Sequence, residues 1–189
     1  MSHFDAAERN RLLAILKERS WVRGEVTLAS GKKSDFYIDC RQSALHAEGA
    51  FLIGKAVFAY IEDLRASGQP IEGVGGMTLG ADPIAAAAAV ASHQGGAPAH
   101  AFIVRKEIKA HGTGSAVEGM RNFEPGAPVL MVEDVVTTGD STIKAWKRAV
   151  DAGLKPVAVL ALVDREEGAA DAFAAEGIPW KALYQRQDF

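Results

Sequence analysis

From about residue 72 onward, short apolar runs alternate with segments of helical character. The apolar runs, among them VLMV at 129–132 and VAVLALV at 157–163, are hydrophobic throughout and therefore predict buried strands. Helix formers or helical spacing follow after Pro83, over 141–152 and around 169–176. Such alternation is typical of a parallel sheet covered on both faces. We therefore expect an α/β fold with strands at 72–75, 101–104, 128–132, 156–163 and 180–184.

The first 70 residues show a different pattern. Asp5 and Glu8 have the spacing of a capping box, and leucine and isoleucine then repeat at helical spacing, which predicts a helix over 5–19. A second helix is expected over 47–66, where a Ser-Gly pair ends it. Between the two helices, an aromatic and β-branched stretch predicts a short strand at 36–39.

The composition is that of an ordinary globular protein. The chain has 189 residues, 48% of them hydrophobic, and we expect one domain over 1–189. Its 21 lysines and arginines against 24 acidic residues give a net charge of −3, which argues against nucleic acid as a partner. We expect neither a signal peptide nor a membrane span, because no segment approaches the roughly 20 apolar residues that a span needs. The single cysteine, Cys40, excludes an intrachain disulfide and indicates a small buried residue in a cytoplasmic protein.

The most informative segment is VLMVEDVVTTGDST at 129–142. Two acids stand at the carboxyl end of its strand, and hydroxyl residues surround Gly139 where a helix begins. Backbone N–H groups at this helix start, together with the helix dipole, can hold a phosphate. Ligands of such folds bind beyond the carboxyl ends of the strands. We therefore predict a phosphate site faced by the loops after Gly75, Val104, Val132 and Val163.

Glu133 and Asp134 add a second kind of chemistry beside the predicted phosphate site. Carboxylates in this position suit sugar hydroxyls, a cation, or both. Because adjacent residues of a straight strand point to opposite faces, both acids reach one ligand only if the strand is already turning. The alternative interpretation is an ordinary helix start with two solvated acids.

A basic stretch follows the strand that ends at Val104. Arg105, Lys106, Lys109 and His111 place four potential cations within seven residues. A departing pyrophosphate accumulates negative charge, which such a loop would stabilise. The alternative is a solvated basic loop, but its place on the same sheet edge as the acids favours the first interpretation.

Arg165 follows the strand that ends at Val163. Its guanidinium suits a planar carboxylate or a pyrimidine carbonyl, and the alternative is a surface ion pair with Glu166 or Asp164. Phe36 and Tyr37 are candidates to shelter a base, although aromatic residues in a strand more often belong to the core.

Five stretches together resemble a known enzyme family. The segment 129–142 resembles the phosphoribosyl pyrophosphate (PRPP) motif of type I phosphoribosyltransferases. The pattern RKxxKxHG at 105–112 is similar to that of the orotate enzymes among them, and it is quite specific to those enzymes. The remaining matches, in the order of the family, are LASGKKSDFYIDCR at 28–41, GGMTLGADP at 75–83 and VDR at 163–165.

The resemblance implies a fold, a reaction and an assembly. The fold is that of type I phosphoribosyltransferases, a central parallel sheet flanked by helices, with a small hood mainly from residues 1–45 and a core of about 46–189. The reaction transfers the 5-phosphoribosyl group from PRPP to orotate, giving orotidine 5′-monophosphate (OMP) and pyrophosphate in de novo pyrimidine synthesis. The implied cofactor is Mg²⁺, held mainly through PRPP with no protein ligand assigned. The implied assembly is a homodimer whose basic loop reaches the site of the neighbouring subunit.

The same resemblance implies roles for individual residues. Lys109, His111 and Asp134 are the implied catalytic residues, and Thr137 and Arg165 are the implied contacts to orotate. The implied PRPP contacts come from the basic loop and the motif: Arg105, Lys106, Lys109, His111, Glu133, Asp134, Val135, Val136, Thr137, Thr138, Gly139, Asp140 and Ser141.

The chain departs from the family pattern at two places. Some members have lysines that contact PRPP near the positions of Ala29 and Leu79. This chain lacks lysines at these positions, so we assign neither of them as a ligand. Two other functions stay open: a phosphoribosyltransferase for another nucleobase, and a non-catalytic regulator that senses PRPP or nucleotides. A dinucleotide-binding oxidoreductase is disfavoured because 73–78 does not complete GxGxxG.

Overall fold

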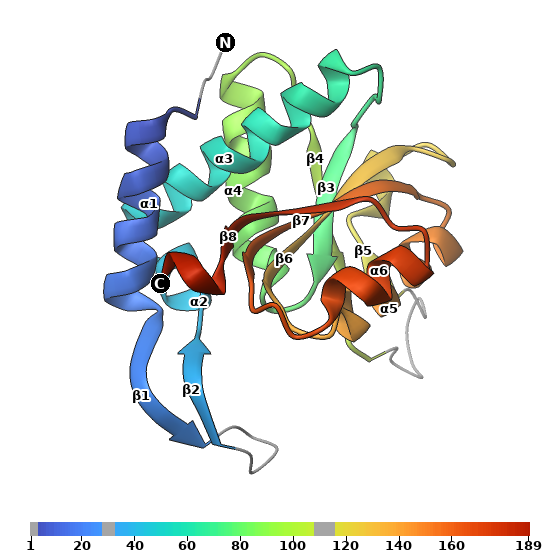
Figure 1. The fold of residues 1–189 in the computed structure, drawn as a ribbon. Coiled ribbons are helices and arrows are strands. Elements are labelled where there is room, and N and C mark those ends of the chain that lie inside the picture. Colours follow the sequence, from blue (N-terminus) through green and yellow to red (C-terminus); the bar gives the residue numbers. More distant parts are fainter. Residues whose placement is uncertain (1–3, 28–32, 108–115) are drawn as a thin grey trace.

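A computed structural model describes residues 4–27, 33–107 and 116–189 of the chain. Within these residues, the main sheet has six strands in the order β5-β4-β3-β6-β7-β8, and each neighbouring pair is parallel except β4 and β5 (Figure 1). This confirms the predicted parallel α/β sheet. Its strands are β3 (Gly73–Met77), β4 (His100–Val104), β5 (Val117–Glu118), β6 (Pro128–Val136), β7 (Lys155–Asp164) and β8 (Trp180–Gln185).

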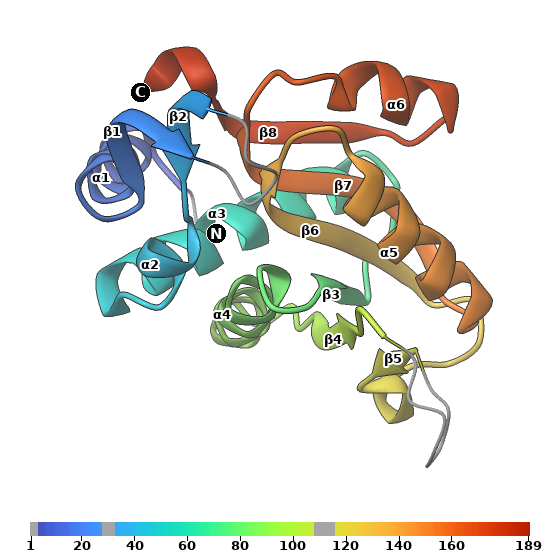
Figure 2. The ribbon, with the colours of Figure 1, turned by 90° about the horizontal axis from the view of Figure 1, so that it is seen from below.

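Helices cover both faces of the main sheet (Figure 2). α3 (Ala47–Ala66) and α4 (Ala81–Gln94) lie on one face, and α5 (Asp140–Asp151) and α6 (Ala169–Ala175) on the other. The apolar run of β6 serves both faces, since Leu130 and Val132 belong to the core under α3 and α4 while Val129 and Met131 belong to the core under α5 and α6. The period of two along a strand therefore explains why this run contains no polar residue.

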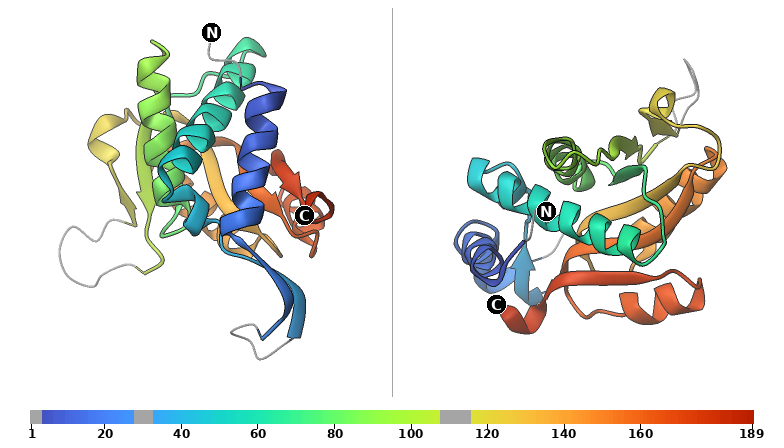
Figure 3. Two further views of the ribbon diagram at one scale, coloured as in Figure 1. Left: turned by 90° about the vertical axis from the view of Figure 1, so that its left-hand side faces the viewer. Right: turned by 90° about the horizontal axis from the view of Figure 1, so that it is seen from above.

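The N-terminal segment forms a separate layer beside α3. α1 (Ala6–Arg19) begins at the predicted capping box, in which the N–H of Glu8 donates to Oδ1 of Asp5 at 2.8 Å. α1, α3 and α4 lie side by side (Figure 3). After α1 come the antiparallel strands β1 (Trp21–Thr27) and β2 (Lys33–Ile38), and then the short helix α2 (Arg41–Ala44).

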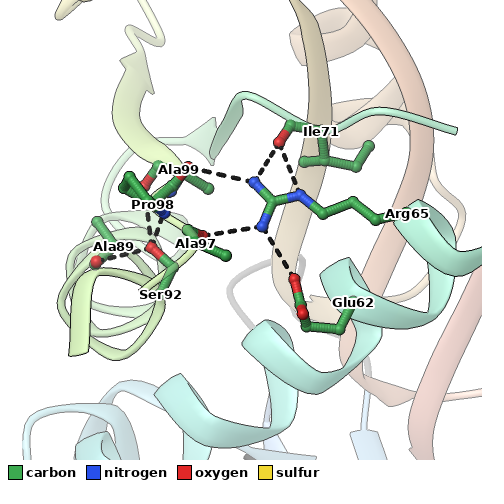
Figure 4. A network of polar contacts seen from close by, with 8 residues as sticks. All are labelled: Glu62, Arg65, Ile71, Ala89, Ser92, Ala97, Pro98 and Ala99. Carbon is green, nitrogen blue, oxygen red and sulfur yellow. Dashed lines mark hydrogen bonds and ion pairs between the residues drawn. The ribbon is translucent and has the colours of Figure 1, made fainter. Parts of the chain in front are cut away.

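Arg65 ties the end of α3 to the segments that lead into β3 and β4 (Figure 4). Its guanidinium donates to the carbonyl oxygens of Ile71, Ala97 and Pro98 and pairs with Glu62. This network satisfies carbonyls that precede two central strands, and so it fixes where those strands enter the sheet.

The last residues of the chain return to the N-terminal layer. After β8, η2 (Arg186–Asp188) places Phe189 edge-on to Phe36 and Trp21, at ring-centre distances of 5.6 and 6.1 Å. The hydroxyl of Tyr184 donates to the carbonyl of Arg9 at 2.7 Å. In the described part of the chain, no helix is both long and apolar enough to cross a membrane.

The structure differs from the sequence prediction at several element boundaries. β6 continues to Val136, so Glu133 and Asp134 lie within the strand because its pairing with β7 continues as far as Val136 and Asp164. α4 begins at Ala81 rather than at Pro83. Five elements were not predicted: β1, α2, β5, η1 (Met120–Asn122) and η2.

Candidate active site

A cavity of about 370 Å³ lies at the carboxyl end of the main sheet, between β3, β6 and the N-terminal layer. In Figure 1 this is the end toward which β3 points, where β1 and β2 also lie. The cavity brings together the predicted residues Lys106, Glu133, Asp134, Val135 and Ser141. Its other lining residues are Tyr37, Ile38, Asp39, Arg41, Met77, Thr78, Leu79 and Gly80.

Glu133 lies on the side of β6 that faces α5. It is 6% exposed and accepts a hydrogen bond from the hydroxyl of Thr142 at 2.8 Å and a longer one from Ser141 at 3.4 Å. Burial, reinforced by the neighbouring Asp134 carboxylate, raises the pKa of Glu133 to about 8. The Glu133 carboxyl group therefore holds its proton more strongly than an ordinary glutamate, and its hydrogen bonds tie the start of α5 to the end of β6.

Asp134 lies against the turn after β3. A Cβ on Gly80 would lie only 2.3 Å from Oδ1 of Asp134, so this turn and the carboxyl group are in close contact. Burial raises the pKa of Asp134, and the charge of Arg41 acts in the opposite direction. Both acids line the cavity, and their carboxyl groups are close enough for each to shift the pKa of the other, so the end of β6 brings both side chains to one site.

The predicted phosphate loop joins β6 to α5. Gly139 precedes the helix with φ 86°, and among the described residues no side chain caps this helix start. The first N–H groups of α5 therefore keep their capacity to bind an anion. The hydroxyl of Thr138 donates to Asp140 at 3.1 Å, and the carbonyl of Thr137 accepts from Ala169. The predicted residues Val136, Thr137, Thr138, Gly139 and Asp140 adjoin the cavity in sequence but do not line it.

The turn after β3 brings backbone to the other side of the cavity. Thr78, Leu79 and Gly80 line it, and the peptide bond between Thr78 and Leu79 is cis. The hydroxyl of Thr78 donates to Asp82 at 2.7 Å, which fixes the turn to the first residues of α4. This arrangement offers backbone rather than lysine side chains to a ligand, in line with Leu79 standing where some family members have a lysine.

The structure describes two of the four predicted basic residues after β4. Lys106 is exposed and lines the cavity, whereas Arg105 donates from Nε to Glu118 at 2.6 Å. Arg105 thus has a carboxylate partner on β5 that the sequence pattern did not indicate. Lys109 and His111 lie outside the described residues.

Arg165 follows β7, and its guanidinium packs toward the N-terminal layer. It is 8% exposed, pairs with Glu167 at 2.7 Å and lies 6.0 Å from the ring centre of Phe36. Arg165 thus forms an ion pair with Glu167, a residue that the alternative interpretation of the sequence did not name. Phe36 is buried and precedes Tyr37, a cavity residue, whereas Arg165 itself is not among the lining residues of the cavity.

Asp39 and Arg41 are cavity residues that sequence analysis did not single out. They form an ion pair at 2.7 Å, and Arg41 supplies a cation beside Asp134. Their position in the stretch 28–41, which resembles the family, was the available signal. Between them, Cys40 is fully buried and the pKa of its thiol is raised well above its ordinary value, which fits the predicted small buried residue and not a nucleophile.

The fold and this cavity define a class of proteins, although no family model matches the chain. The class is the type I phosphoribosyltransferases: orotate phosphoribosyltransferase of Mycobacterium tuberculosis H37Rv, solved with Fe(III) dicitrate, superposes with a TM-score of 0.79 at 40% identity, over 96% of this chain and 98% of that one. Orotate phosphoribosyltransferase of Sorangium cellulosum is 48% identical over 189 residues, which are 100% of this chain and 96% of the relative. The chain therefore belongs to the orotate phosphoribosyltransferase family and is a transferase.

A second structure of the Mycobacterium tuberculosis enzyme contains PRPP. It is 36% identical to this chain, with a TM-score of 0.75 over 96% of this chain and 98% of that one. The likeness thus extends over nearly the whole of both chains.

Proposed function

We propose that this chain transfers the 5-phosphoribosyl group from PRPP to orotate, giving OMP and pyrophosphate, in the cavity at the carboxyl end of the main sheet. The observation that carries the proposal is the convergence of an acidic pair, a turn of exposed backbone and a lysine on one cavity, beside an uncapped helix start. Family membership favours this reaction over transfer to another nucleobase, and it favours an enzyme over a non-catalytic sensor.

Each part of the cavity suits one part of PRPP. Glu133 and Asp134 would face the ribose hydroxyls or metal-bound waters, and the loop that ends at Ser141 would hold the 5-phosphate. The pyrophosphate would meet Lys106, whose cation stabilises the charge that develops as the bond to the anomeric carbon breaks. By family resemblance Arg105, Lys109 and His111 take part in the same step. The chemistry is direct transfer of the ribosyl carbon from pyrophosphate oxygen to a ring nitrogen of orotate, with no covalent enzyme intermediate.

Orotate would bind beside the N-terminal layer. Arg165 offers a guanidinium that suits the orotate carboxylate or a ring carbonyl, and its ion pair with Glu167 and its contact with Phe36 fix its orientation. Thr137, at the start of the phosphate loop, is the second proposed contact. Holding the base in this orientation would speed the transfer mainly because orotate and PRPP lose their freedom of motion on binding rather than in the transition state.

The residues present fit Mg²⁺ that arrives with PRPP. Mg²⁺ prefers oxygen ligands and usually takes one or two carboxylates plus substrate phosphates, and Asp134 and Glu133 are the carboxyl groups of this cavity that suit that set. Among the described residues, no group of three or more acidic, histidine or cysteine side chains forms a metal site of its own. When bound, the cation would neutralise charge on the pyrophosphate.

We also propose that the chain is a homodimer with shared sites. Leu45, Phe51 and Val90 are each more than half exposed along a groove of about 970 Å³ between α3 and α4. Leu79, also more than half exposed, continues this apolar face to the edge of the catalytic cavity. Large exposed apolar patches are typical of protein interfaces, and a partner covering this one would lie beside the site.

The proposal also covers the division of the chain into two parts and its location in the cell. Residues 1–45 would act as the hood and about 46–189 as the core, a division supported by the separate layer that α1, β1 and β2 form beside the main sheet. A cytoplasmic location is supported by the single cysteine, which is buried.

Substrate choice is the experiment that tests the proposed function. Purified protein with Mg²⁺ and PRPP is offered orotate, uracil, hypoxanthine and adenine separately, while base consumption and pyrophosphate release are followed. We expect turnover with orotate alone. Turnover with another base would keep the PRPP site and refute the role of Arg165, and binding of PRPP without any turnover would refute catalysis.

A further inference from the structure

Arg148, near the end of α5, holds the backbone at the start of the basic stretch. Its Nη1 donates to the carbonyl oxygens of Arg105 and, at 2.9 Å, of Lys106. Arg148 is half-buried, so these bonds are partly shielded from water and correspondingly stronger. One guanidinium thus fixes two successive carbonyls from a different part of the chain.

Arg105, which carries the first of these carbonyls, is held by further contacts. The backbone N–H of Arg105 donates to the carbonyl of Ala116 at 2.9 Å, and its side chain pairs with Glu118. Lys106 comes next, and its own side chain is exposed and lines the cavity that contains Asp134. The backbone that carries Lys106 is therefore held while its side chain is left to contact a ligand.

α5 connects this attachment to the phosphate loop. The helix begins at Asp140 directly after Gly139, and Arg148 lies eight residues later, a rise of about 12 Å. Two regular helical turns have little freedom to change length. The loop proposed to hold the 5-phosphate and the backbone of Lys106 therefore keep a set separation through one helix.

We propose that Arg148 is a positioning residue, which holds the backbone of Lys106 so that its ammonium group meets the pyrophosphate of PRPP while the start of the same helix holds the 5-phosphate. The inference rests on the proposed function, in which Lys106 contacts pyrophosphate. A backbone that is already in place reduces the freedom lost when the lysine binds, and this strengthens binding of the pyrophosphate group alone.

Equilibrium binding of two ligands to the full chain with Mg²⁺ tests the inference. In Arg148→Ala, we expect the Kd of pyrophosphate to rise about tenfold and that of OMP to change less than about twofold, because OMP lacks the pyrophosphate group. Lys147→Ala is the matched control: it removes the neighbouring exposed side chain, whose partner is Glu176 at 2.7 Å, and should change neither Kd. A merely structural Arg148 would weaken both ligands together, and that result would overturn the inference.

Arg148→Lys provides a second variant should the alanine variant fail to fold. It keeps the positive charge but replaces the planar fork by a single ammonium group on a shorter side chain. We expect an intermediate rise in the Kd of pyrophosphate, with OMP again unaffected. A Kd for pyrophosphate equal to that of the wild type in the folded variants would overturn the inference.

A double variant separates this inference from the proposed function. Lys106→Ala alone asks whether Lys106 contacts pyrophosphate, and an unchanged Kd would refute that contact and the inference with it. If Lys106→Ala does weaken pyrophosphate, Lys106→Ala combined with Arg148→Ala should bind it no more weakly, because Arg148 acts through Lys106. Losses that add would overturn the positioning role while leaving the contact of Lys106 in place.

Discussion

Glu133 and Asp134 are adjacent carboxyl groups with different partners. Glu133 accepts hydrogen bonds from the start of α5, whereas Asp134 lies against Gly80 with Arg41 nearby. Burial and the Asp134 carboxylate raise the pKa of Glu133 to about 8, whereas Glu133 and Arg41 both act to lower the pKa of Asp134, so the pair ionises first at Asp134. An amide at position 133 thus replaces the group that ionises last, while an amide at position 134 removes the first charge of the pair.

This difference predicts unequal effects of two isosteric substitutions. Asp134→Asn should lower kcat/KM for PRPP by about tenfold or more, because the charge beside the proposed ribose and cation site is lost. Glu133→Gln should lower it by less than about threefold, because glutamine can still accept the hydrogen bond of Thr142. Steady-state kinetics at pH 7 with PRPP varied would check this. Equal losses in the two variants would contradict the assignment of the charge to Asp134.

The raised pKa of Glu133 also predicts how stability varies with pH. A folded pKa of about 8 lies above the ordinary value of 4.5, so between these pH values the folded protein binds more protons than the unfolded chain. The free energy of unfolding therefore falls as the pH rises through this window. Glu133→Gln cannot ionise at this position, so it does not lose stability in this way. As the pH rises, its Tm should therefore increase relative to that of the wild type, by about 3 °C for each kcal/mol of unfolding free energy that the wild type loses.

Thermal unfolding of both proteins from about pH 5 to about pH 9 measures this gain. Glu48→Gln is a suitable control, because Glu48 is exposed and its pKa is lowered by Arg11 rather than raised. A difference in Tm between wild type and Glu133→Gln that stays constant over the window would contradict the shifted pKa.

At the scale of elements, glycines with positive φ flank α5 at both ends. Gly139 (φ 86°) precedes the helix and Gly153 (φ 93°) follows it. Alanine at either position strains the backbone by about 1–2 kcal/mol, and at Gly139 its Cβ would also lie 3.0 Å from the ring of Phe173. We expect both Gly139→Ala and Gly153→Ala to lower the free energy of unfolding, but only Gly139→Ala to weaken PRPP binding.

Urea unfolding and titration with PRPP distinguish the two glycine variants. Gly153→Ala serves as the matched control, since it alters the same helix far from the proposed phosphate site. If both variants bound PRPP with equal affinity, the backbone at Gly139 would have no part in holding the 5-phosphate.

Elements with local signals were predictable from the sequence. The predicted helix at 47–66 coincides with α3, and the capping box at Asp5 begins α1, because caps and periodicity lie within each segment. β1 has the sequence WVRGEVT, which carries no clear alternation, and it is a strand through its pairing with β2. β5 has two residues and likewise depends on its pairing with β4.

The candidate site likewise has a part that the sequence predicts and a part that only the structure shows. The acids at 133–134 were predictable because strand, acids and helix start are consecutive in the chain. Only the path of the chain in three dimensions places the charge of Arg41 near Asp134 and brings Arg148 to the carbonyls of Arg105 and Lys106. No spacing in the sequence encodes those contacts.

At the scale of the whole molecule, the apolar face formed by Leu45, Phe51, Leu79 and Val90 bears on how the sites are completed. A two-fold dimer through this face would bring each cavity close to the partner, because Leu79 belongs to both the face and the cavity lining. If the basic loop acts across the interface, as the family resemblance implies, each site takes Asp134 from one subunit and Lys109 from the other.

Mixing two inactive variants tests this arrangement. Lys109→Ala and Asp134→Asn homodimers each have one defect in every site and should be nearly inactive. In a mixed dimer with shared sites, one site collects both defects and the other collects none. Random exchange of subunits at equal concentrations makes half of the dimers mixed, so about a quarter of all sites should regain wild-type activity. If the loop instead served its own subunit, every site would keep one defect, and mixing the variants would restore no activity.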